Sequence, residues 1–138
     1  MIIQLKDKKN MVASPQDVDK ILRALLAAED DVDRDKEHFW VFQLDTRHRI
    51  KVLELASLGI LTAALVHPRE VFTRAISSRC NSILVAHNHP SGDPTPSHED
   101  LLVTKQLRDA GVLLDIPLTD HVIIGESGYT SWKEQGLI

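Results

Sequence analysis

The sequence predicts an α/β fold in which helices flank a mixed β-sheet within a single domain. Short apolar runs typical of strands are intermixed with stretches whose apolar residues follow helical spacing. Both tight polar turns and longer crossover connections separate the expected strands, which favours a sheet with parallel and antiparallel pairs. The length of 138 residues fits one domain and leaves little room for a second core.

The first expected helix begins after residue 14. Ser14, Pro15 and Asp17 supply a capping side chain, a proline at the first helical position and an acid in the first turn. The acidic segment 29–37 follows and is expected to be a solvated connector. Residues 1–36 are therefore expected to form an N-terminal helix and connector that belong to the same domain as residues 37–138.

The middle of the chain predicts a hairpin, a helix and a buried strand. Residues 39–45 and 50–59 are rich in β-branched and aromatic side chains around a polar turn, where His48 should be exposed. Pro68 opens a helix, and residues 82–86 form a short apolar run that suits a buried strand. The side of that helix expected to face inward carries Val71, Phe72, Ala75 and Ile76.

The rest of the chain predicts an irregular loop, a helix and short final elements. Residues 87–96 contain three prolines and a glycine, which argues against helix or regular strand there. Ser97 should cap a helix that runs to about Ala110, with Gly111 as its stop. Short strands are expected around residues 112–115 and 121–124, with a last helical turn over residues 131–134.

The composition is that of an ordinary soluble globular protein, with 43% hydrophobic and 26% charged residues. A net charge of −4 argues against a domain that depends on phosphate contacts. No apolar run approaches the roughly 20 residues that a membrane-spanning helix needs, and the charged start does not fit a signal peptide. The single cysteine, Cys80, is expected to be semi-buried rather than a nucleophile. A cytoplasmic location follows as an expectation.

Two histidines and an aspartate have the spacing of a metal site. His87 and His89 lie two apart at the end of a strand, so both imidazoles can point to the same side. Asp100 falls in the first turn of the next helix, where side chains tilt back toward the preceding loop. Two neutral imidazoles and one carboxylate suit zinc and leave a fourth position for water, which is the catalytic arrangement.

The same residues also have a purely structural interpretation. Ser97 and Asp100 match the capping-box pattern [ST]-x-x-[DE], which by itself would explain both of them. A histidine at the end of a strand is more often a hydrogen-bonded structural residue than a ligand. On spacing alone, both interpretations stay open. Asp93 fits turn chemistry, His121 is expected to be structural or to support the ligands, and His38 should face away from residue 37.

A resemblance to a known family adds to this pattern. The string HNHPSGDPTPSHED matches the H-x-H-x7-S-x-x-D signature of the JAMM (JAB/MPN) metalloproteases at His87, His89, Ser97 and Asp100. The surrounding segments LDTRHRI, VHPREVF and DHVIIG resemble the bacterial RadC-like branch, from about residue 37 to the C-terminus. The resemblance implies the JAB/MPN (deaminase-like) fold, with the two histidines and the aspartate as ligands of one zinc ion.

The resemblance also implies two catalytic residues. Glu37, just before the first strand of the hairpin, matches the family glutamate that holds the zinc water and shuttles its proton. Spacing alone cannot select it, because the chain also offers Glu54, Glu70 and Glu99. Ser97 matches the family serine that helps to stabilise the oxyanion of the tetrahedral intermediate.

The expected function is therefore that of a zinc-dependent metallopeptidase or isopeptidase of the JAMM type. Its partner would be a peptide or protein substrate, including a ubiquitin-like conjugate. The alternative is a DNA repair-associated accessory module of the RadC type. The sequence ahead of Glu37 has one helix and an acidic connector, without the glycine-centred hairpin that would hold phosphates, so DNA is disfavoured as a partner. Another hydrolysis at the same site is a third alternative, although no Cys-x-x-Cys pair supports a cysteine-ligated nucleobase deaminase.

Overall fold

The computed structural model describes residues 2–3, 11–59 and 66–138. Within these residues the chain forms a six-stranded sheet in the order β1-β3-β2-β4-β5-β6. The strands are β1 (Ile2–Ile3), β2 (His38–Leu44), β3 (Ile50–Leu58), β4 (Ser82–Asn88), β5 (Leu118–Ile124) and β6 (Tyr129–Ser131). Strands β4 and β5 are parallel and the other neighbouring pairs are antiparallel, so the sheet is mixed, as the sequence predicts.

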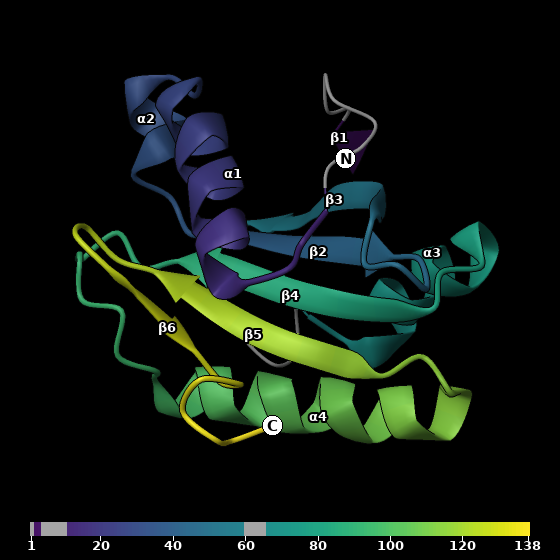
Figure 1. The fold of residues 1–138 in the computed structure, drawn as a ribbon. Helices are drawn as coiled ribbons and strands as arrows, with labels where there is room; N and C mark the ends of the chain where they lie inside the picture. Colours follow the sequence, from purple (N-terminus) through teal and green to yellow (C-terminus); the bar gives the residue numbers. More distant parts are fainter. Residues whose placement is uncertain (1, 4–10, 60–65) are drawn as a thin grey trace.

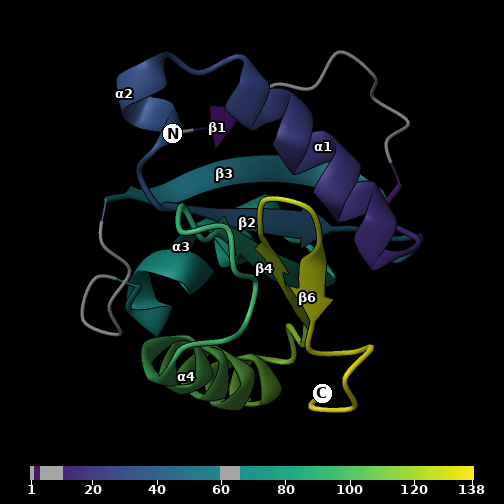
Figure 2. The ribbon, with the colours of Figure 1, turned by 90° about the vertical axis from the view of Figure 1, so that its left-hand side faces the viewer.

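Helices cover both faces of this sheet. α1 (Pro15–Ala27) and α2 (Asp31–Arg34) lie on one side, and α3 (Pro68–Ser78) and α4 (His98–Leu114) lie on the other (Figure 1). Figure 2, turned by 90°, shows the sheet between α1 and α4. The predicted α/β class with flanking helices is confirmed. No helix in the described ranges combines the length and the apolar character needed to cross a membrane.

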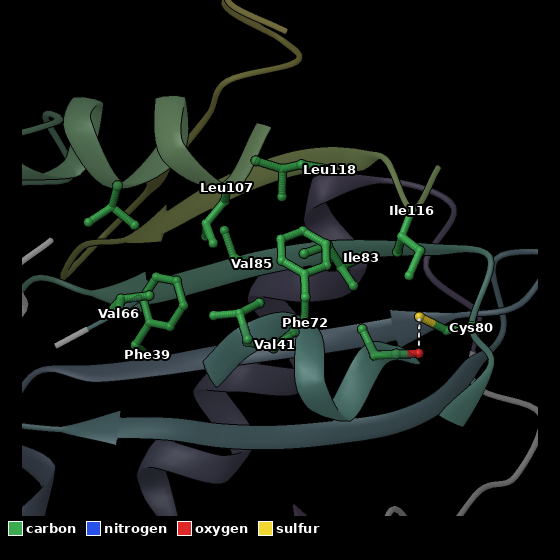
Figure 3. Packing of buried hydrophobic residues seen from close by; sticks show 13 residues of the cluster. Phe39, Val41, Val66, Phe72, Cys80, Ile83, Val85, Leu107, Ile116 and Leu118 are labelled. Carbon is green, nitrogen blue, oxygen red and sulfur yellow. Dashed lines mark hydrogen bonds between the residues drawn. The ribbon is translucent and has the colours of Figure 1, made fainter. Parts of the chain in front are cut away.

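The central strands β2 and β4 are buried along their whole length because alternate residues face the two helical layers. Phe39 and Val41 point toward α3 and α4, where they join a cluster that contains Leu107 (Figure 3). Trp40 and Phe42 point the other way and join a second cluster with α1. The sheet therefore carries a core on each face.

The single cysteine, predicted to be semi-buried, belongs to the first of these cores. Cys80 is buried, and its thiol donates a 3.5 Å hydrogen bond to the carbonyl oxygen of Ala75 (Figure 3). Burial also raises the pKa of the thiol, which disfavours the reactive thiolate.

Several local predictions are confirmed. Ser14 is the N-cap of α1, and its backbone N–H donates to the Asp17 carboxylate over 3.1 Å. Val18 and Leu22 are the buried side chains of that helix. Strands β2 and β3 form the predicted hairpin, and His48 is exposed in its turn.

Two predictions before β4 need correction. The segment 29–37 contains the one-turn helix α2, because the Asp30 side chain accepts a 2.7 Å hydrogen bond from the backbone N–H of Asp33 and caps it. On α3 the buried stripe is narrower than predicted. It consists of Val71, Phe72 and Ala75, whereas Ile76 is 53% exposed because it turns away from the sheet.

The predicted end of α4 is also wrong. The helix continues through Gly111 to Leu114, so no strand forms at residues 112–115, and β5 begins at Leu118. Gly111 is buried, and a Cβ atom there would lie 2.6 Å from the carbonyl oxygen of Ile116. This glycine lets the chain pass close beside the helix as it returns to the sheet, which a stop signal does not explain.

The ends of β4 and β6 differ from the sequence prediction as well. Strand β4 includes His87 and Asn88, because their pairing with Ile123 and Ile124 of β5 continues the parallel ladder into the region expected to be irregular. Ser131 belongs to β6, and residues 132–136 form hydrogen-bonded turns instead of a helix.

Candidate metal centre

The two histidines and the aspartate singled out by the sequence come together where β4 ends beside the start of α4. His87 pairs with Phe39 of β2 and lies on the face of the sheet that α4 covers. His89 follows β4 directly, and Asp100 lies in the first turn of α4. Figure 1 shows the loop that leads from β4 to α4 at this edge of the sheet. The ligand atoms of the three residues all lie within 4.8 Å of one another.

The distances within this group are short and nearly equal. His87 Nε2 lies 3.0 Å from His89 Nε2. Asp100 directs Oδ1 to the His87 nitrogen and Oδ2 to the His89 nitrogen, each over 3.0 Å. His87 and Asp100 are buried, whereas His89 is partly exposed. One carboxylate therefore faces both imidazoles at a site that solvent reaches from one side.

The contact between the Asp100 carboxylate and the two imidazoles shifts the pKa values of Asp100 and His89. Burial by itself would raise the pKa of the Asp100 carboxyl, but the His87 and His89 imidazoles outweigh it and hold that pKa far below its usual range. The Asp100 carboxylate in turn raises the pKa of His89, against the opposing effect of burial. The site therefore attracts positive charge.

The donor set fits a metal ion. His89 Nδ1 lies 2.8 Å from the carbonyl oxygen of Asp93, which can only accept, so this nitrogen carries a proton. In the neutral imidazole the Nε2 atom then presents a lone pair toward the Asp100 carboxylate. A cation among these atoms would replace the repulsion of converging lone pairs by attraction. The buried group of His87, His89 and Asp100 could therefore bind a metal ion.

The structural interpretation of Ser97 and Asp100 is correct without excluding the metal site. The Ser97 backbone N–H donates to Asp100 Oδ2 over 2.8 Å, and the Asp100 backbone N–H donates to Ser97 Oγ over 3.1 Å. These bonds form the predicted capping box at the start of α4. The capping box holds the carboxylate in place while both of its oxygens still face the histidines.

Glu37 and Ser97 lie beside this group in an open pocket of about 320 Å³, which His89 also lines. After the effect of Asp100, the negative charge of Glu37 contributes to the raised pKa of His89. The position of Glu37 follows from the register, since Phe39 pairs with His87 and residues two apart share a face of the sheet.

The structure separates Glu37 from the other glutamates that spacing left open. Glu54 and Glu70 line a different pocket beside α3, where Glu54 accepts a 2.7 Å hydrogen bond from Arg74. Glu99 is exposed on α4 and does not line the pocket beside His89.

His121 supports the group, and two of its neighbours were not predicted. His121 is fully buried, and its Nε2 lies 2.8 Å from His87 Nδ1. Burial lowers the pKa of His121 well below its usual value. Its Nδ1 contacts the hydroxyl of Thr104, and its ring stacks on Trp132. Thr104 lies four residues after Asp100, a spacing that places both on one helix face, whereas no local sequence pattern indicates the role of Trp132.

Other polar residues near the site have the roles expected of them. Asp93 Oδ1 accepts hydrogen bonds from the backbone N–H and the hydroxyl of Thr95, so its carboxylate serves the turn. His38 stacks on Trp40 on the opposite face of the sheet, with ring centroids 5.1 Å apart. Neither side chain is a ligand of the candidate centre.

A mixed α/β domain that places two histidines and an aspartate around one point is the architecture expected of a JAB domain, and the comparison with known families agrees. The chain belongs to the family of RadC-like JAB domains, whose model matches residues 12–137.

Its relatives include several UPF0758 proteins. A UPF0758 protein of Syntrophomonas wolfei is 45% identical over 130 residues, which cover 94% of this chain and 55% of the relative. A UPF0758 protein of Methanosarcina mazei is 40% identical over 134 residues, which cover 97% of this chain and 56% of the relative. UPF0758 protein TTE0897 of Caldanaerobacter subterraneus is 44% identical over 136 residues, which cover 99% of this chain and 56% of the relative. The chain thus spans about half the length of the curated relatives it matches.

Proposed function

We propose that this domain is a zinc-dependent hydrolase of the JAMM metallopeptidase type, which cleaves peptide or isopeptide bonds. The observation that supports this most directly is the convergence of two imidazole nitrogens and one carboxylate beside an open pocket. Membership of the RadC-like JAB family supports the same chemistry.

Zinc suits the donor set better than Mg²⁺ or Ca²⁺ does. Mg²⁺ and Ca²⁺ prefer sites made of oxygen ligands, whereas His87 and His89 offer two nitrogens. Three protein ligands leave a fourth position open, as in catalytic zinc sites. When bound, zinc would polarise a water molecule and lower the pKa of that water to near neutrality.

Glu37 and Ser97 would carry the proton transfer and charge stabilisation. The Glu37 carboxylate, at the wall of the pocket beside His89, would accept a proton from the attacking water and return it to the leaving amine nitrogen. The Ser97 oxygen accepts its capping bond from the Asp100 backbone N–H, and a hydroxyl that accepts in this way can still donate its proton. The Ser97 hydroxyl would donate a hydrogen bond to the substrate carbonyl oxygen as negative charge develops there.

The substrate we propose is a peptide or protein, including a ubiquitin-like conjugate joined through a lysine side chain. The pocket opens to solvent and is lined largely by polar side chains. An amide bond carried on an extended chain could reach His89 and Glu37 from the side on which His89 is exposed.

The proposal is tested by metal content and cleavage measured together. Purified protein should bind about one zinc ion per chain by mass spectrometry of its metals. Cleavage is followed with a quenched-fluorescent library of random peptides and with a reporter that joins a peptide to a lysine ε-amine. Glu37→Gln should abolish cleavage while keeping zinc. Glu70→Gln, an exposed change on α3, should leave both the cleavage and the zinc content unchanged. Absence of zinc binding would overturn the metal assignment, and zinc binding without cleavage of either probe would overturn the substrate class.

A further inference from the structure

A continuous line of hydrogen bonds runs from α4 through β5 to the candidate metal ligand on β4. The Thr104 hydroxyl donates to the backbone carbonyl of Asp100 over 2.8 Å. The same oxygen contacts His121 Nδ1, and His121 Nε2 lies 2.8 Å from His87 Nδ1. Thr104, His121 and His87 are all buried, so water does not substitute for any of these partners.

The first bond fixes the direction of the others. A hydroxyl has one proton, and Thr104 gives it to a carbonyl oxygen that can only accept. Its oxygen must therefore accept from His121, which places a proton on His121 Nδ1. A second proton would place a positive charge on a fully buried ring whose nitrogens, among the described residues, contact only Thr104 and His87, which is strongly unfavourable. His121 Nε2 is then an acceptor, and His87 must donate to it from Nδ1.

We propose that Thr104 and His121 are positioning residues that select the Nδ1–H tautomer of His87 and so turn its Nε2 lone pair toward the metal. This inference rests on the proposed metal site. For His89 the carbonyl of Asp93 performs the same task directly. For His87 a two-residue relay performs it, and the relay begins on the helix that also supplies Asp100.

Aromatic contacts fix the orientation of the His121 and His87 rings. The Trp132 ring stacks on His121 with centroids 4.3 Å apart and planes inclined by 11°. The Phe39 ring is nearly perpendicular to the His121 ring, with centroids 6.1 Å apart, and its centroid lies 6.2 Å from that of His87. Because both imidazoles are packed in this way, neither ring can turn to exchange its nitrogens without displacing core side chains.

The relay is tested with an isosteric pair at residue 104. Thr104→Val keeps the shape and removes the hydroxyl, whereas Thr104→Ser keeps the hydroxyl. Zinc affinity is measured by competition with a chromophoric chelator. Thr104→Val should weaken zinc binding about 10-fold to 100-fold, and Thr104→Ser should stay close to the wild type. His121→Phe, which removes the acceptor for His87, should weaken zinc binding at least as much as Thr104→Val. Equal zinc affinity in the wild type and Thr104→Val would overturn the relay.

A second readout does not require zinc binding. Nuclear magnetic resonance of ¹⁵N-histidine protein identifies which nitrogen of His121 carries the proton, with and without zinc. The relay requires the proton on Nδ1 in both states, and a proton on Nε2 would overturn it even if Thr104→Val fails to fold. Wild-type protein that binds no zinc but shows the Nδ1–H tautomer would contradict the proposed function and not the direction of the hydrogen bonds.

Discussion

The side-chain oxygen of Asn88 accepts a 2.6 Å hydrogen bond from the backbone N–H of His38. The Nδ2 atom of Asn88 also donates to the carbonyl oxygen of Lys36 over 3.1 Å. These two backbone groups flank Glu37. Asn88 itself lies between His87 and His89, and its side chain points to the opposite face from theirs. One amide therefore ties the segment that carries Glu37 to the strand that carries the histidines.

We expect Asn88→Ala to release Glu37 while leaving the metal ligands in place. The change leaves the buried backbone N–H of His38 without its acceptor, which should lower the free energy of unfolding by about 1–3 kcal/mol. Zinc affinity should change little, and the cleavage rate should fall because Glu37 is no longer held at the pocket. Denaturant unfolding, zinc titration and the peptide probes measure the three effects. Asn81→Ala, at an exposed residue before β4, is the control, and equal losses in both variants would contradict this role.

The contact between Gly125 and the ligand-bearing loop gives a second prediction. A Cβ atom on Gly125 would lie 2.5 Å from the Gly92 carbonyl oxygen and 2.8 Å from Pro94 Cδ. Gly125→Ala should therefore push away the loop whose Asp93 carbonyl holds His89, and zinc affinity should fall by about tenfold or more. Gly128→Ala is a matched control in the same turn, because its Cβ would meet nothing within 4 Å. Equal zinc affinities of the two variants would show that the close contact of Gly125 with Gly92 and Pro94 does not hold the loop in place.

The candidate ligands were predictable because their signals are local. Strand alternation puts His87 and His89 on one side, and the helix start puts Asp100 opposite them. The capping pattern at Ser97 also described a real contact, and only the structure shows that capping and convergence on the histidines coexist. The class of fold was predictable for a similar reason, since periodicity marks each strand and helix without reference to distant residues.

Asn88 and Trp132 support the site through contacts between segments that are distant in sequence. Local sequence patterns do not reveal such contacts, so these two roles were not predicted. Asn88 acts on β2 through a pairing across 50 positions of sequence, and Trp132 reaches His121 from beyond β6. The prediction that Gly111 ends the helix is wrong for the same reason. A glycine that stops a helix and a glycine that admits a neighbouring chain look identical in sequence, and only the close carbonyl of Ile116 distinguishes them.

The core between the sheet and α4 should contribute strongly to stability. Leu107 is fully buried in it, and Leu107→Ala should lower the free energy of unfolding by about 2–5 kcal/mol through lost burial and a residual cavity. Leu113→Ala on the same helix removes a side chain that is 85% exposed and should change stability by about 0.5 kcal/mol or less. Urea unfolding of both variants measures the difference. Similar losses at the two positions would mean that α4 does not pack on the sheet as described.

The raised pKa of His89 predicts how zinc binding depends on pH. Protons and zinc compete for His89 Nε2, and the Asp100 carboxylate keeps that proton bound to a higher pH than in an ordinary histidine. In the zinc-free protein this raised pKa contributes stability that is complete below the unfolded pKa of about 6.5 and is lost as pH rises through the folded pKa. The lowered pKa of Asp100 contributes stability above its unfolded value of about 3.9, so it is constant between about pH 6 and pH 8.

Zinc should therefore raise the melting temperature much more at about pH 8 than at about pH 6, whereas the zinc-free protein should lose the His89 contribution over the same interval. Thermal unfolding with excess zinc and with a chelator, at several pH values, measures both trends. The variant His98→Ala removes an exposed histidine at the start of α4 and should keep the pH profile of the wild type. A zinc-induced shift that is the same at both pH values would mean that no histidine proton is displaced, and His89 would then not be a ligand.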